Sequence, residues 1–279
     1  MEKSRLVKIC HTVPTAFLSM YQDRQDYTFI EANTLLKDSA YRNYHLRLKE
    51  KNPDLYIIMD NSAYIRDEGP LSEKDYMNAY EIIEPNCVIA LDHPSDARAT
   101  IDTTRNFVKN YKAKIDAKIM GVPQGKDYAS YHTCAWYLLD DGLVDVIGLN
   151  MFMDWPNRGV DGLEKSEKMC RLRIWMMYQM QDMVTEAIRS DKKFRAIHLL
   201  GVILGRELNE IVEHNFTHFK SCDTSSAFMH GFHGIRYGKK GLKAKAWDKK
   251  IDYSITSLTP KQEKDIEHNM HMLDNLRGA

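Results

Sequence analysis

Asp60, Asp92 and Asp223 each stand at the end of a short apolar run of the sequence. If these runs are parallel strands of a barrel, their carboxyl ends share one rim, where catalytic groups gather. Two carboxylates with separate duties are what glycosidic chemistry needs: one attacks or stabilises the sugar carbon, and the other moves protons on the leaving group. A third carboxylate and a carboxamide, such as that of Gln124 or Asn150, can then recognise a polar heterocycle.

Each of these aspartates also has a purely structural alternative. An aspartate at the end of a strand often caps the following helix or fixes a turn. Three of them at one rim favour a functional site over three separate caps. The sequence therefore predicts a nucleophile and an acid/base group at this rim.

Histidines raise the question of a metal site, because histidine and aspartate are common ligands of zinc and iron. The candidates are His93, His198, His230 and His233. They are scattered and include no helical HxxxH pair, which favours hydrogen-bonded wall residues for His93 and His198. Cys222, beside Asp223, is a candidate thiol nucleophile, but a cysteine in an apolar strand is more often buried and inert. We therefore expect no metal and no cofactor.

The overall composition limits the class of protein. Lysine and arginine number 39, as do aspartate and glutamate, so no global positive field attracts nucleic acids or membrane surfaces. The five cysteines form no CxxC or CxC pair that could hold zinc, which is typical of a reduced cytosolic chain. No apolar run reaches the ~18 residues of a membrane helix, and the charged start lacks the apolar stretch of a signal peptide. We expect a soluble, cytoplasmic protein with no membrane partner.

Eight apolar or β-branched runs recur along the chain and are predicted to be strands. They are Leu6–Cys10, Tyr27–Glu31, Leu55–Asp60, Cys87–Asp92, Ala117–Val122, Val144–Asn150, Arg195–Val202 and Thr217–Asp223. Most are near-continuous, as expected for covered parallel strands, and the intervals are long enough for helical crossovers. Alternating strands and helices indicate an α/β fold, and eight strands favour one (β/α)8 TIM barrel domain over residues 1–279. A doubly wound open sheet is the alternative, although no GxGxxG follows the first strand.

Helix signals fill several intervals, among them Ser72–Ile83, Asp96–Lys112 and Lys165–Ser190. The last interval holds a Met and Trp cluster between residues 175 and 183. On a long amphipathic helix such a cluster is more typical of core packing than of a ligand surface. The tail, residues 259–279, starts with a helix-entry pattern and predicts a C-terminal helix.

Basic residues concentrate in one segment, residues 230–250, whose glycines at 231, 234, 238 and 241 predict a flexible loop. Four of its side chains are candidates to hold nucleic-acid phosphates: Arg236, Lys239, Lys240 and Lys243. A solvated surface loop is the alternative, because phosphate binding leaves no unique spacing.

Six segments, in chain order, are similar to segments of one known family. They are 59–63 (Met-Asp-Asn-Ser-Ala), 90–92 (Ala-Leu-Asp), 120–125 (Met-Gly-Val-Pro-Gln-Gly), 146–150 (Val-Ile-Gly-Leu-Asn), 198–202 (His-Leu-Leu-Gly-Val) and 220–224 (Lys-Ser-Cys-Asp-Thr). Between about Asp54 and Ala227 the chain thereby resembles the tRNA-guanine transglycosylase superfamily. Within that superfamily it is most similar to the shorter phage and bacterial DNA 7-deazaguanine transglycosylases.

The resemblance implies a TIM barrel that replaces guanine in DNA with a 7-deazaguanine base of the preQ0 type, without a cofactor. It makes Asp223 the nucleophile and Asp60 the general acid/base. It assigns recognition of the base to Asp92, Gln124, Gly148, Asn150 and His198. Members of the family often pair, so a homodimer is a further expectation.

The chain departs from the family pattern at several positions. Ser62 and Ala63 stand where the family has glycines, and residues 224–226 read Thr-Ser-Ser in place of Pro-Thr-Arg. The tRNA enzymes also carry a CxCxxC-plus-histidine zinc site, whereas no cysteine follows Cys222 here. We therefore expect the zinc subdomain to be absent, which favours action on DNA over action on tRNA.

Three alternatives to this function stay open. One is tRNA base exchange by an enzyme of reduced architecture, and another is a hydrolase that only removes a base. The third is a barrel without catalysis that binds a nucleobase or a nucleic acid.

Overall fold

The computed structural model describes residues 7–22, 25–63, 71–140, 142–150, 165–190, 196–238 and 251–276. Contacts divide the chain into two compact units. Unit 1 comprises Met1–Asp26, Asn150–Gln181 and His198–Ala279, and unit 2 comprises Tyr27–Leu149 and Asp182–Ile197. Each unit is described separately below.

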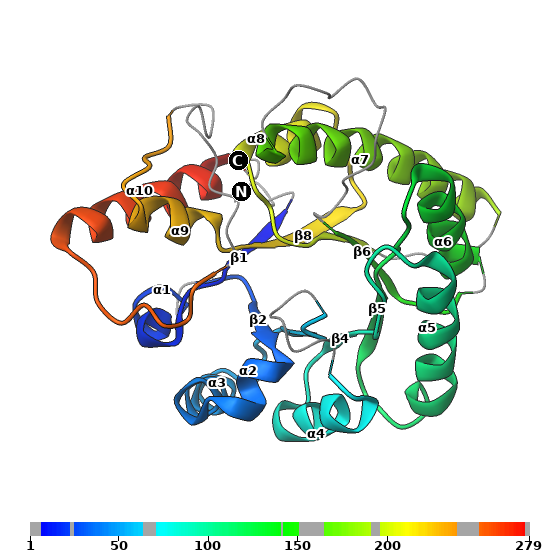
Figure 1. Cartoon of the computed structure of the whole chain (residues 1–279), viewed down its shortest axis with the longest axis horizontal. Coiled ribbons are helices and arrows are strands. Elements are labelled where there is room, and N and C mark those ends of the chain that lie inside the picture. The colour runs from blue at the N-terminus through cyan, green and yellow to red at the C-terminus, as the bar shows by residue number, and fades with distance from the viewer. Residues whose placement is uncertain are drawn as a thin grey trace. The chain divides into compact units, whose positions relative to one another are not determined.

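Eight parallel strands form one sheet in the order β1-β8-β7-β6-β5-β4-β3-β2 (Figure 1). The strands are β1 (Lys8–His11), β2 (Thr28–Glu31), β3 (Ile57–Asp60), β4 (Cys87–Ile89), β5 (Lys118–Gly121), β6 (Val146–Leu149), β7 (Ala196–Leu199) and β8 (Phe219–Thr224). Helices alternate with them, and β1 and β2 stand at the two ends of the strand order. This confirms the predicted (β/α)8 fold class.

The strands form where the sequence is continuously apolar, because both of their faces are covered. All four residues of β2 and all four of β6 are buried. Several strands are shorter than predicted: β4, expected to reach Asp92, ends at Ile89. The segment that follows β4 leaves the strand ladder and carries Asp92 into the cluster described below.

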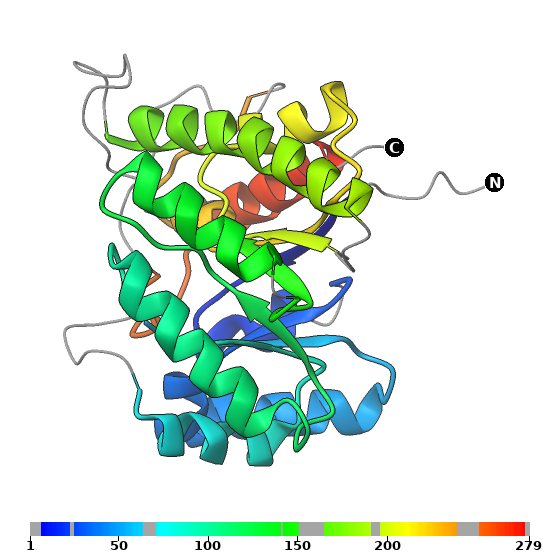
Figure 2. The same ribbon diagram turned by 90° about the vertical axis from the view of Figure 1, so that its right-hand side faces the viewer.

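In unit 2, several helices begin directly after a polar residue whose side chain caps the first turn. Ser72 Oγ accepts a hydrogen bond from the backbone N–H of Asp75 (3.1 Å), and Asp96 Oδ1 accepts one from Ala99 (3.0 Å). The helices are α2 (Ala32–Lys37), α3 (Ser39–Lys51), α4 (Glu73–Ile83), α5 (Ala97–Tyr111) and α6 (Tyr128–Asp140). Figure 2 shows α5 and α6 side by side, in contact with each other.

In unit 1, β1 pairs with β8 in a register that sets Cys10 opposite Asp223. The short segments η1 (Thr15–Phe17) and α1 (Leu18–Tyr21) follow β1. The helices α8 (Gly205–Glu213), α9 (Ser226–Phe232) and α10 (Pro260–Leu276) also belong to this unit. The last confirms the predicted C-terminal helix.

The helix α7 (Lys165–Arg189) confirms the predicted helix from residue 165. Its methionines at 176, 177, 180 and 183 are buried, as expected for core packing rather than for a ligand surface. No helix among the described residues is long and apolar enough to span a membrane.

The predicted loop over residues 230–250 needs a correction at its start, because His230–Phe232 complete the helix α9. Gly231 is a packing residue there: a Cβ at this position would lie 2.5 Å from the backbone nitrogen of Ile266 in α10. Its missing side chain lets α9 and α10 lie directly against each other (Figure 1). Residues 239–250 of the segment lie outside the described part of the chain.

Candidate active site

Asp223 lies near the carboxyl end of β8 in unit 1, and its carboxylate is anchored through one oxygen. Oδ1 accepts a hydrogen bond from the backbone N–H of Gly201 (3.1 Å) and lies 3.1 Å from His198 Nε2. Among the described residues, both hydrogen bonds to this carboxylate end on Oδ1. The side chain is 12% exposed, so the group is shielded but still open to solvent.

His198, on β7, connects this carboxylate to a hydroxyl group. Its Nδ1 lies 2.7 Å from Ser221 Oγ, and its side chain is completely buried. If the serine hydroxyl donates to Nδ1, the ring carries its proton on Nε2 and donates it to Asp223. Ser221 and Asp223 are two residues apart on β8 and share one face, so a single imidazole can contact both.

A buried ion pair holds the loop that contributes the N–H of Gly201. Arg173, on α7, pairs through Nε with Glu207 of α8, and both side chains are fully buried. The same guanidinium donates from Nη1 to the carbonyl of Leu200 and from Nη2 to that of Gly201 (3.0 Å). Gly201 has a φ of 62°, a left-handed conformation that favours glycine. Arg173 therefore holds the backbone of the loop after β7, and the N–H of Gly201 in this loop points toward Asp223.

In unit 2, Asp92 forms the centre of a buried cluster of side chains. Asn61 Nδ2 donates to Asp92 Oδ1 (2.6 Å) and to the carbonyl of Ala90 (2.7 Å). Gln124 Nε2 donates to the other oxygen, Oδ2. The three residues follow the ends of β3, β4 and β5, where parallel strands bring their carboxyl ends together.

Burial raises the pKa of Asp92 to about 6, because desolvation disfavours its charged form. The hydrogen bonds from Asn61 and Gln124 act in the opposite direction and lower the pKa. In the part of the chain that the structure describes, this carboxyl group is held by two carboxamide donors and forms no ion pair. Such a group can accept hydrogen bonds from a heterocycle without attracting phosphates.

Asp60 ends β3 and is half-buried, in contrast to Asp92. Its Oδ2 accepts a hydrogen bond from the backbone N–H of Ser62 (3.1 Å). Ser62 has a φ of 61°, in the left-handed region that glycine adopts at least cost. The chain therefore turns at Ser62 in a backbone conformation that is uncommon for residues other than glycine.

The other predicted site residues divide into three groups. Gly148 lies within β6 of unit 2, and Asn150, in unit 1, is buried. Arg236 is engaged on α10, where it lies 3.2 Å from His268 Nδ1 and 3.7 Å from Asp265 Oδ1. Lys239, Lys240 and Lys243 lie outside the described residues.

The histidines considered as metal ligands have separate hydrogen-bond partners. His93 Nε2 lies 2.9 Å from Thr103 Oγ1, and His230 Nδ1 lies 2.6 Å from Tyr237 Oη. In the described ranges, no group of three or more His, Cys, Asp or Glu side chains could hold a metal ion. Cys222 is fully buried, and burial raises the pKa of its thiol well above the ordinary value, which disfavours a reactive thiolate.

Sequence reasoning did not assign roles to Asn61, Ser221, Arg173 or Glu207. Three of them carried a signal. Asn61 adjoins Asp60, and Ser221 lies on the same strand face as Asp223. Arg173 is a cation on the apolar side of a helix, which indicates a buried partner but does not say which one. No family model and no curated protein sequence matches the chain.

Proposed function

We propose that the chain is a base-exchange transglycosylase that replaces guanine in DNA with a 7-deazaguanine base of the preQ0 type. The observation that carries the proposal is the one-sided anchoring of Asp223. His198 and the N–H of Gly201 orient Oδ1, which leaves Oδ2 to attack a sugar carbon. A carboxylate that is oriented, shielded and still 12% exposed suits a nucleophile better than a helix cap.

The proposed reaction is a double displacement. Asp223 Oδ2 attacks C1′ of the target nucleotide, the C1′–N9 bond breaks, and its electron pair leaves with guanine while Asp60 donates a proton to the departing base. An ester between Asp223 and C1′ results. The incoming base then attacks C1′ through N9 as Asp60 takes the N9 proton, and the bond to Asp223 breaks.

Recognition of the base is assigned to the cluster around Asp92. A carboxylate offers about four lone-pair positions, so Asp92 can accept N–H groups of a purine-like base while Asn61 and Gln124 hold it in place. Gln124 forms a hydrogen bond on the carbonyl side of the base, and the lack of a side chain at Gly148 lets the base approach the backbone. Asn150 and His198 complete the predicted base-binding residues, with His198 acting through Asp223.

The target nucleotide has to leave the base stack, because C1′ and N9 are inaccessible in a stacked duplex. Extruding one nucleotide costs a few kcal/mol and is cheapest in single-stranded DNA. Arg236, Lys239, Lys240 and Lys243 are the proposed phosphate contacts. For Arg236 this requires release from Asp265 and His268.

The test is an exchange assay that compares the native chain with Asp223→Asn and with Asp252→Asn. Asp252 is an exposed aspartate of the same unit, so its variant controls for the loss of one carboxylate. Each protein is incubated with single-stranded DNA or tRNA and with preQ0 base, and the nucleosides are then analysed by mass. We expect exchange into DNA, with the exchange rate reduced at least about 10³-fold only in Asp223→Asn.

The other outcomes select among the alternatives. Exchange into tRNA alone moves the substrate to tRNA, and abasic DNA without incorporation indicates a hydrolase. Binding of base or nucleic acid that survives Asp223→Asn, with no turnover in any variant, indicates a non-catalytic barrel. Full exchange by Asp223→Asn contradicts the assigned nucleophile.

A further inference from the structure

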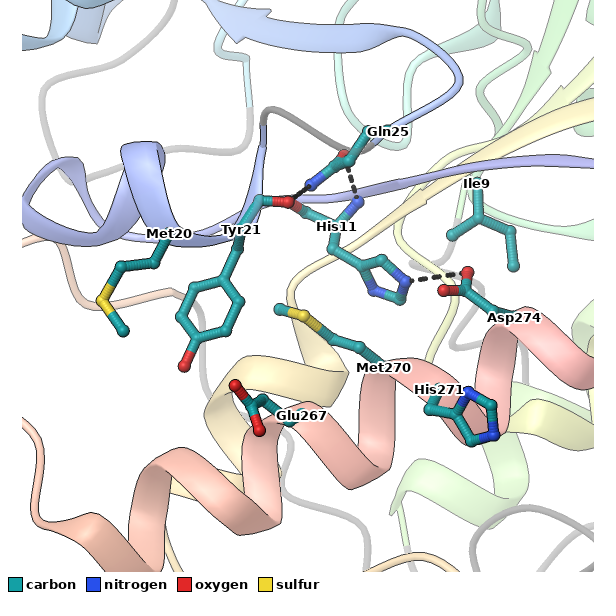
Figure 3. Close-up of a pocket in the computed structure, with 9 residues that line it drawn as sticks. All are labelled: Ile9, His11, Met20, Tyr21, Gln25, Glu267, Met270, His271 and Asp274. Carbon is teal, nitrogen blue, oxygen red and sulfur yellow. Dashed lines mark hydrogen bonds and ion pairs between the residues drawn. The ribbon is translucent and has the colours of Figure 1, made fainter.

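A second feature of unit 1 is a cavity of about 370 Å³ between the end of β1, the helix α1 and the helix α10 (Figure 3). Its walls include His11 and Tyr21 from the N-terminal segment and Glu267, Met270 and Asp274 from α10. None of these residues belongs to the proposed transglycosylase site.

The cavity lies on the other side of the β1–β8 strand pair from the nucleophile. Cys10 is in register with Asp223, and side chains alternate between the two faces of a strand. Ile9 and His11, which line the cavity, therefore face away from the side that Cys10 and Asp223 share. A ligand in the cavity does not compete directly for the nucleophile.

Acidic and unsatisfied polar groups border this space. Glu267 is exposed and makes no hydrogen bond or ion pair with any residue that the structure describes. Tyr21 is 8% exposed, and its hydroxyl has no hydrogen-bond partner within the described ranges. Figure 3 shows this hydroxyl beside the Glu267 carboxylate. Burial, Glu267 and Glu263 raise the pKa of Tyr21 to about 12, so the phenol is neutral and sits in a negative potential.

His11 and Asp274 form a polar pair in the same wall. His11 Nε2 lies 3.3 Å from Asp274 Oδ1. The other ring nitrogen, Nδ1, is buried and has no hydrogen-bond partner in the described part of the chain. An unsatisfied buried polar group costs about 1–3 kcal/mol, and a ligand that supplies a partner recovers part of that cost.

Gln25 and His271 are two further polar residues of the lining, and Ile9, Met20 and Met270 supply its apolar part. Met20 is 45% exposed, whereas most large apolar side chains of the described residues are buried. Met270, which also lines the cavity, is buried. Thioethers and an aromatic ring favour a ligand that combines apolar surface with positive charge.

We propose that this cavity binds a small organic cation, a protonated amine or guanidinium on a short apolar body. The charged head meets Glu267 and the Tyr21 hydroxyl, and the body packs on Met20, Met270 and the tyrosine ring. A metal ion does not fit this chemistry, because the described residues bring no three metal-ligating side chains together. An anion is disfavoured by the carboxylates at the mouth.

The test is a titration of the protein labelled with ¹³C at its methionine methyl groups. The probe is phenethylamine, and the comparison compound is 2-phenylethanol, a neutral molecule of nearly equal size. We expect the amine to move the methyl signals of Met20 and Met270, with the buried Met59 and Met120 of unit 2 as internal references. Met→Leu variants assign the signals.

Two variants locate the charge that recognises the probe. Glu267→Gln removes the acidic group at the mouth, and Glu213→Gln removes an exposed carboxylate elsewhere in unit 1. Loss of one charge-assisted hydrogen bond is expected to weaken amine binding about 10-fold in Glu267→Gln. Glu213→Gln should bind as the native chain does.

Three results overturn the proposal. They are the absence of any shift of Met20 and Met270 with phenethylamine, equal binding of 2-phenylethanol, and equal weakening by Glu213→Gln. The assay needs no base-exchange activity, so its outcome tests the proposed cation site independently of the proposed transglycosylase function.

Discussion

Asp92 and Asp223 differ in how the fold holds their oxygens. Asp92 is 3% exposed, and a carboxamide donates to each of its oxygens. Asp223 is anchored through Oδ1 alone and remains partly exposed. The arrangement of Asp92 suits a fixed hydrogen-bond acceptor that recognises a ligand. That of Asp223 suits a group that changes its bonding during a reaction.

The raised pKa of Asp92 leads to a prediction at this scale. Its ¹³C carboxyl signal should titrate with a midpoint near pH 6, whereas Asp252, whose pKa is lowered by Ser254, should titrate below 3.8. The native state favours protonated Asp92. The native state therefore binds this proton more tightly than the unfolded chain does, and the free energy of unfolding falls as the pH rises from about 4 to about 6.

A substitution separates the causes of this shift. Gln124→Ala removes a donor that lowers the pKa, so the Asp92 midpoint should rise further while that of Asp252 stays unchanged. A native midpoint near pH 4, or a fall in the midpoint upon Gln124→Ala, would show that burial does not dominate at Asp92.

At the scale of elements, the loop between β7 and α8 depends on a side chain from α7. Arg173 binds two carbonyls of this loop and pairs with Glu207. Glu207 Oε2 in turn accepts the N–H groups of Ile203 (2.8 Å) and Leu204 (3.1 Å) at the start of α8. One buried ion pair thus connects two helices to the backbone that orients Asp223.

Breaking this pair should be costly because it leaves a buried charge alone. Arg173→Met is expected to lower the free energy of unfolding by about 3–5 kcal/mol, measured by urea titration. Adding Glu207→Gln should restore at least ~1 kcal/mol, because glutamine is neutral and still accepts the two N–H groups.

Arg171→Met is the matched control for this experiment. Arg171 lies on the same helix, is 48% exposed and pairs with Glu167 at the surface. Its loss should change the free energy of unfolding by no more than about 0.5 kcal/mol. Two results would show that burial of the ion pair does not cause the loss of stability. One is an equal decrease in the free energy of unfolding for Arg171→Met and Arg173→Met. The other is a decrease in the Arg173→Met/Glu207→Gln double variant that equals the sum of the two single decreases.

For the whole molecule, local sequence patterns were sufficient to predict the eight strands in their order and the four helices α4, α5, α7 and α10. The apolar runs ending at Asp60 and Asp223 became β3 and β8, and the helix-entry signal at Thr259 became α10. Periodicity and caps are local properties, so one sequence can reveal them. The start of the segment 230–250 was an exception: its glycines indicated a loop, whereas Gly231 lies in α9 and packs against α10.

The details of the site depended on contacts between distant residues. Arg173 and Glu207 are 34 positions apart, and His198 and Asp223 are 25 apart. No local pattern says which partner a buried polar residue will find. The cavity beside Tyr21 likewise joins α1 to α10, from opposite ends of the chain, and left no signal in the sequence.

The proposed mechanism requires a covalent bond between Asp223 and the sugar, and trapping that intermediate tests it most directly. The protein is mixed with guanine-containing single-stranded DNA without an incoming base, denatured rapidly, digested and analysed by mass. The account predicts a peptide containing Asp223 that carries the oligonucleotide minus guanine, and no such adduct in Asp223→Asn. An adduct on Asp60, or base exchange that persists in Asp223→Asn, would contradict the account.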